Sequence, residues 1–254
     1  MILETLWIAV RAAVLGGTLA TDRAAGWNFM FSQPIVGACL AGAFVNTGPW
    51  EDWAFRIPIG VGALLQLLLT DASLPAAQRQ HDTATAGVVG STVAILGMAR
   101  LSESFPVATE GAFWVVVGVV AGLLAAVGGG WVMGYHRARN LEDTRRAETL
   151  AAEGKAGAFE RLYYGSLLRV FALGFLWSWG ASVLGLAACL ALLPRVAGFL
   201  TAQHVGFLLA GLLGCGLAAA YHAHVRGRRG APAWAALGAA VALVLLAVLR
   251  KGTP

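Results

Sequence analysis

Eight apolar segments recur along the chain, and this pattern restricts the possible folds more than any other feature. They lie at about 5–20, 29–46, 55–70, 84–100, 112–135, 166–194, 199–222 and 232–249. A helix that crosses a bilayer needs roughly 20 mostly apolar residues. Only 12% of the residues are charged, whereas soluble domains carry about 25%. The sequence therefore predicts an integral membrane protein.

The membrane part is expected to consist of helices. No segment shows the alternation of polar and apolar residues that marks an outer-membrane barrel strand. We therefore expect an all-α, polytopic bundle with about seven to nine apolar segments. Several segments are too short to span, and lipid cannot satisfy exposed backbone groups, so these segments must be re-entrant hairpins or broken helices sheltered by other protein.

One long hydrophilic segment, residues 136–161, separates an N-terminal bundle (1–135) from a C-terminal bundle (162–254) within one membrane domain. The segment is rich in arginine, and the positive-inside rule places it in the cytoplasm as a charged loop. Glu142 and Arg146 stand at the i, i+4 spacing that supports a helix, which Gly154 interrupts. Two interpretations stay open, a solvated connector and a docking surface for soluble partners.

The net charge of +5 follows from such loops and favours anionic lipid headgroups over nucleic acid. Nucleic-acid binding would need a basic face with aromatic or motif context, which the sequence lacks. Cys39, Cys189 and Cys215 lie inside apolar segments without paired spacing, so we interpret them as buried small hydrophobic residues. No metal site and no cofactor are expected.

Several polar or aromatic residues beside the apolar segments have structural interpretations. Arg169 and Arg195 are expected to extend toward the membrane interface, and His204 to be a satisfied polar residue between helices. Most tryptophans flank apolar segments, as an interfacial aromatic belt would. This set comprises the tryptophans at positions 50, 53, 114, 131, 177 and 179.

The stretch from Gln66 to Asp82 holds more hydrogen-bonding groups than a plain turn needs. Pro75 breaks the helix to which Gln66 belongs. Transporters build midplane sites from such broken segments, and amides and carboxylates in a sheltered cavity can pair with several sugar hydroxyls. A second polar break, near Asp22 and Gln33, separates the first two apolar segments.

Signatures of catalysis are missing from the sequence. It has no phosphate-binding loop, no HExxH, no GxSxG and no zinc spacing of Cys and His. We therefore expect a protein that is not an enzyme and has no catalytic residues, although an intramembrane enzyme remains an alternative.

Three stretches resemble the membrane IIC subunit of the mannose/fructose/sorbose family of the bacterial phosphoenolpyruvate-dependent sugar phosphotransferase system. The first, TDRAAGWNFMFSQPIVGACLAG, is similar to the amino-terminal pattern of that family. The second, VGALLQLLLTDASLPAAQRQHDTATAG, is similar to its signature, with Gln66 at the position of a Glu and Asp82 at that of an Asp. The third, VMGYHRARNLEDTRRAETLAAEGKAGAFERLYYGSLLRVF, looks like its central loop.

The resemblance implies a multi-pass permease subunit in the bacterial cytoplasmic (inner) membrane that moves a hexose-type sugar inward. Its expected partners are a IID membrane subunit and cytoplasmic IIA and IIB components, which phosphorylate the sugar, and a homo-oligomer is possible. The residues expected to line the sugar path are Asp22, Gln33, Gln66, Asp71, His81 and Asp82.

The second stretch departs from the family pattern where function would lie. Gln66 replaces a carboxylate, Asp71 and Ala76 replace glycines, and His81 replaces a proline. An alternative function is therefore a divergent, non-transporting structural or regulatory membrane partner of phosphotransferase components.

Overall fold

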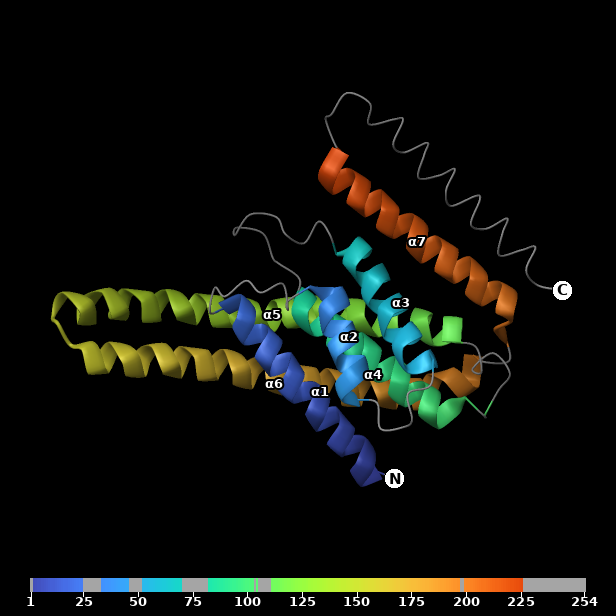
Figure 1. The fold of residues 1–254 in the computed structure, drawn as a ribbon, viewed down its shortest axis with the longest axis horizontal. Helices are drawn as coiled ribbons and strands as arrows, with labels where there is room; N and C mark the ends of the chain where they lie inside the picture. Colours follow the sequence, from blue (N-terminus) through green and yellow to red (C-terminus); the bar gives the residue numbers. More distant parts are fainter. Residues whose placement is uncertain are drawn as a thin grey trace.

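The computed structural model describes residues 2–24, 33–45, 52–69, 82–102, 104, 111–196 and 199–225. Over these residues the chain is all-α, with seven helices and no strand (Figure 1). The helices are α1 (Ile2–Ala24), α2 (Pro34–Val45), α3 (Asp52–Leu68), α4 (Thr83–Leu101), α5 (Gly111–Ala152), α6 (Ala156–Val196) and α7 (Ala202–Val225). Three of them, α5, α6 and α7, are long and apolar enough to cross a membrane. The predicted class, an all-α membrane protein, is confirmed.

The helices coincide with the first seven predicted apolar segments, and the eighth, residues 232–249, lies outside the described residues. With 12 and 17 residues, α2 and α3 are about 18 and 26 Å long, shorter than the roughly 30 Å of a hydrocarbon core. Other protein shelters α2, which packs against α1, α3 and α4. The sequence had predicted such short, sheltered segments.

The centre of the bundle is α4, which contacts α1, α2, α3, α5 and α6. All ten residues from Thr85 to Ala94 are buried. Two glycines permit this packing, because a Cβ on Gly87 would overlap the Pro34 carbonyl oxygen of α2 and a Cβ on Gly90 would lie 2.5 Å from the Gly118 carbonyl oxygen of α5. Neighbouring backbones therefore approach α4 from two sides.

Small residues also join α1 to α6. The buried residues of α6 recur at every fourth position, so they form one stripe along the helix. They are Val170, Gly174, Ser178, Ser182 and Leu186. A Cβ on Gly16 of α1 would overlap the Ser178 side chain, and one on Gly17 would lie 2.8 Å from the Phe171 carbonyl oxygen. Close packing of small residues is typical of helix pairs in membranes.

Helices α5 and α6 form a long antiparallel hairpin that projects beyond the other helices (Figure 1). With 42 and 41 residues, each is about 60 Å long. The turn between them contains Gly154 at φ +67°, where glycine avoids the strain of a left-handed backbone. The expected helical character of 136–161 and its interruption at Gly154 are confirmed. The expected loop is instead continuous with the apolar helices, because nothing breaks either helix where it becomes polar.

Some predictions for individual side chains were wrong. Trp114 is fully buried against Phe113 rather than interfacial, whereas Trp131 is 65% exposed, as an aromatic belt requires. Cys215 is exposed, unlike the half-buried Cys39 and Cys189. His204 is exposed in the first turn of α7, where its Nδ1 accepts a hydrogen bond from the Thr201 amide at 3.2 Å.

Candidate functional site

Gln33 and Gln66 meet where α2 begins and α3 ends. The Gln66 Nε2 group donates a hydrogen bond to Gln33 Oε1 at 2.7 Å. The two helices run antiparallel and closely, because Gly62 leaves room where a Cβ would lie 2.7 Å from the Ile35 Cα. Both glutamines were predicted to line a substrate path, and the structure brings them together.

Asp82 is the N-cap of α4 and is 4% exposed. Its Oδ1 accepts a hydrogen bond from the Thr85 amide at 3.3 Å, and its Oδ2 accepts one from the Thr85 hydroxyl at 2.7 Å. Its own amide donates to the Ala126 carbonyl oxygen of α5 at 3.0 Å. A carboxylate at this position satisfies helix N–H groups and interacts favourably with the helix dipole. Asp82 therefore has a structural role besides any contact with a substrate.

The helix ends that carry these residues converge. Gly87, in the second turn of α4, lies directly against Pro34, the residue after Gln33. On the other side, Gly122 of α5 leaves room for Leu65, the residue before Gln66, and for the Ala86 carbonyl oxygen of α4. The start of α2, the end of α3 and the start of α4 therefore meet beside α5.

The sequence analysis missed two residues at Asp82. A Cβ on Gly129 of α5 would lie 2.8 Å from Asp82 Oδ2 and 2.9 Å from Trp177 Nε1. Trp177, on α6, donates its indole N–H to the Ala125 carbonyl oxygen at 3.1 Å, so it links two helices rather than facing the interface. The run of three glycines at 128–130 was the available signal, because such a run in a helix needs a packing reason.

The other predicted residues are less informative. Asp22 is 4% exposed near the end of α1, a helix that packs against α2, α4 and α6. Asp71 and His81 lie outside the described residues. In the described part of the chain, no three His, Cys, Asp or Glu side chains are grouped to hold a metal ion. The chain matches no protein-family model and no curated protein.

The arrangement offers neutral hydrogen-bonding groups at sheltered helix ends. Gln33 is exposed and Gln66 is partly exposed, with the Gln66 Oε1 atom itself buried. Each amide carries two donor hydrogens and an acceptor oxygen, and one donor and one acceptor are used in their mutual contact. Neutral amides of this kind suit an uncharged ligand with several hydroxyl groups.

Proposed function

We propose that the chain is a permease subunit that translocates a hexose-type sugar in a phosphoenolpyruvate-dependent phosphotransferase system. Separate cytoplasmic components, IIA and IIB, phosphorylate the sugar, and a IID membrane subunit assembles with this chain. The chain itself performs no catalysis. It crosses the bacterial cytoplasmic membrane several times, with the tip of the α5–α6 hairpin in the cytoplasm.

The observation that carries this proposal is the contact between Gln33 and Gln66 at 2.7 Å. The two residues are 33 positions apart in the sequence, and both were selected from sequence as sugar-facing. In this region α2 begins and α3 ends next to the start of α4, which Asp82 caps. Helix ends that meet within a membrane bundle expose polar groups without exposing unsatisfied backbone to lipid. This supports a substrate site there.

A non-transporting structural or regulatory subunit is the second candidate, and the surroundings of Asp82 favour it. Thr85 engages both carboxylate oxygens, and the residue is almost fully buried. A carboxylate used in this way holds α4 in place whether or not a sugar passes. In this case the resemblance to the IIC family would reflect assembly with phosphotransferase components rather than transport.

Uptake of labelled mannose, fructose, sorbose and N-acetylglucosamine tests the proposal in cells that express the chain together with IIA, IIB and IID phosphotransferase components. Wild type is compared with Gln66→Ala, Gln33→Ala and the matched control Gln203→Ala, since Gln203 is exposed at the start of α7. We expect uptake that depends on phosphoenolpyruvate, is lost in the first two variants and is retained in the control.

The alternative outcomes are distinct. Equal uptake in Gln66→Ala, Gln33→Ala and Gln203→Ala would show that the glutamine pair is not the sugar site. Absence of uptake of every sugar by the wild type, despite membrane insertion and partner assembly, would favour the structural or regulatory subunit. Uptake without phosphoenolpyruvate would indicate a transporter of another kind.

A further inference from the structure

The contact face between α5 and α6 carries polar residues beyond the apolar part of the hairpin. His136 and Asp143 follow Gly129 at intervals of seven residues, so all three lie on one side of α5. His136 is therefore two helical turns, about 10 Å, beyond the point where Asp82 meets α5. Both His136 and Asp143 are buried, at 6% and 5% exposure.

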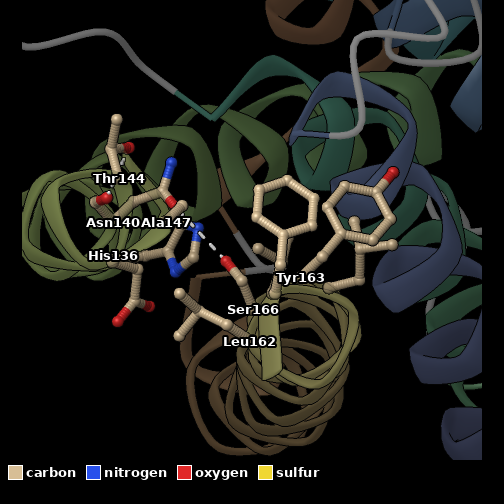
Figure 2. Close-up of a pocket in the computed structure, with 11 residues that line it drawn as sticks. His136, Asn140, Thr144, Ala147, Leu162, Tyr163 and Ser166 are labelled. Carbon is tan, nitrogen blue, oxygen red and sulfur yellow. Dashed lines mark hydrogen bonds between the residues drawn. The ribbon is translucent and has the colours of Figure 1, made fainter. Parts of the chain in front are cut away.

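A cavity of about 190 Å³ opens between the two helices at this level. Figure 2 shows His136 and Asn140 of α5 opposite Tyr163 and Ser166 of α6. The Ser166 hydroxyl donates a hydrogen bond to Asn140 Oδ1 at 3.1 Å, which leaves the two amide hydrogens of Asn140 available. The space is large enough for several water molecules or one small organic molecule.

His136 is the buried polar group that this arrangement leaves unsatisfied. Its Nδ1 has no hydrogen-bond partner among the described residues, although the side chain lines the cavity. Burial, and then the nearby Arg169, lower the pKa of His136, while Asp143 opposes this shift. The imidazole is therefore neutral at pH 7 and offers one acceptor or one donor rather than a charge.

Among the described residues, one ion pair lies at the cavity, and its two charged groups bind each other. Asp143 Oδ2 accepts a hydrogen bond from the Arg169 guanidinium at 2.6 Å, and the Asp143 side chain is only 6% exposed. Arg169 was expected to extend to the interface, and it instead links α6 to α5. Because each charge neutralises the other, the cavity favours neither a cation nor an anion.

The two walls of the cavity differ in character. Polar groups of α5 line one side, whereas Phe159, Tyr163 and Val170 of α6 supply aromatic and aliphatic surface on the other. A sugar or polyol matches such walls, because its hydroxyl groups need hydrogen bonds while its C–H face packs on apolar and aromatic surface. A fully apolar ligand would leave the buried His136 Nδ1 without a hydrogen bond.

We propose that this cavity is a binding site for a small, neutral, polyhydroxylated molecule, of the chemical class of a free monosaccharide or polyol. His136 and Asn140 hydrogen-bond its hydroxyl groups, and Tyr163 packs against its carbon skeleton. The site is separate from the Gln33–Gln66 contact and goes beyond the transport proposal, because binding here requires no transport.

Chemical footprinting of the purified full-length chain in detergent tests this site. Diethyl pyrocarbonate acylates neutral histidine, and peptide mass spectrometry reports the extent at His136 and at the exposed His204 separately. Mannose, sorbitol and inorganic phosphate are the probes, each in a concentration series. We expect mannose or sorbitol to protect His136 saturably, with His204 unaffected and phosphate without effect.

Variants distinguish a specific binding site from a non-specific space between the two helices. Asn140→Ala should raise the half-maximal probe concentration about tenfold, equivalent to about 1.4 kcal/mol. Thr149→Ala, at an exposed position outside the cavity on the same helix, should leave it unchanged. Tyr163→Ala provides a second test if Asn140→Ala fails to fold.

Three results would overturn the proposal: protection by phosphate alone, equal protection of His136 and His204, or no protection by any probe. The last would mean that water alone fills the cavity. Footprinting of the purified chain requires no transport, so a failure of the uptake experiment leaves this result intact.

Discussion

Replacing Gly87 with alanine should destabilise the protein through a single methyl group. The added Cβ would overlap the Pro34 carbonyl oxygen and would lie 2.9 Å from the Ala38 amide nitrogen, where 3.4 Å is an ordinary contact. These are backbone atoms and cannot rotate away, so α2 must move by about half an ångström or more. Because α2 follows directly from Gln33, this movement also strains the 2.7 Å contact with Gln66.

The expected magnitude follows from two opposing effects. Overpacking of a close contact costs about 1–3 kcal/mol, and a clash with backbone belongs at the upper end of that range. Alanine recovers up to about 1 kcal/mol relative to glycine in a helix. The net loss is about 2 kcal/mol, which lowers the Tm of a chain of this size by about 4–8 °C.

Thermal unfolding in detergent, followed by tryptophan fluorescence, measures this change. The matched control is Gly180→Ala in α6, because nothing lies within 4 Å of a Cβ at that position. The control should unfold at the wild-type Tm or slightly above it. If Gly87→Ala proved as stable as Gly180→Ala, the close approach of α2 to α4 would be refuted, and with it the packing that joins the glutamine pair to Asp82.

Three further predictions concern other contacts. Gly16→Val should lower Tm, because its Cβ would overlap Ser178, whereas Gly211→Val, with nothing near its Cβ, should not. Asp82→Ala should cost about 1 kcal/mol by loss of the cap, while Asp82→Asn should keep the stability, so lost uptake in Asp82→Asn would identify a role for the charge. Lowering the pH from 7.5 to 5.5 should destabilise the wild type but affect His136→Gln less. Burial, Arg169 and Arg137 lower the pKa of His136 in the folded protein, while Asp143 opposes this shift. As the pH falls, the histidine of the unfolded chain therefore binds a proton first. The free energy of unfolding then decreases below about pH 6.5, by at most about 1.4 kcal/mol per pH unit. An equal pH dependence of Tm in both proteins would contradict this.

The sequence predicted the helices well because apolar runs in a membrane protein specify where helices lie. It also proposed Gln33 and Gln66 as residues of one site, and whether they bind a substrate stays a prediction. Their contact was not predictable, since it depends on antiparallel packing of two short helices whose closeness is set by Gly62 and Gly87. A single sequence does not reveal which distant surfaces these glycines contact.

The errors at other positions share one physical cause. Trp114 sits near the end of an apolar segment, but its rotation about the helix axis directs it into the core. Asp143 and Arg169 were counted as loop or interface charges, but they form an ion pair between α5 and α6. The seven-residue interval from His136 to Asp143 places these two α5 residues on the face toward α6. Position along a helix predicts depth in the membrane, whereas the face of the helix decides burial.

The length of the α5–α6 hairpin has a mechanical consequence. Each helix is about 60 Å long, roughly twice the thickness of a hydrocarbon core, and one end of the pair extends well clear of the other helices (Figure 1). The Asp143–Arg169 ion pair and the Asn140–Ser166 hydrogen bond join the two helices, so we expect them to tilt together. A rotation of the pair by about 10° would displace a tip about 30 Å from the pivot by about 5 Å. Small tilts of the buried helices would therefore become displacements of several ångströms at the tip of the hairpin.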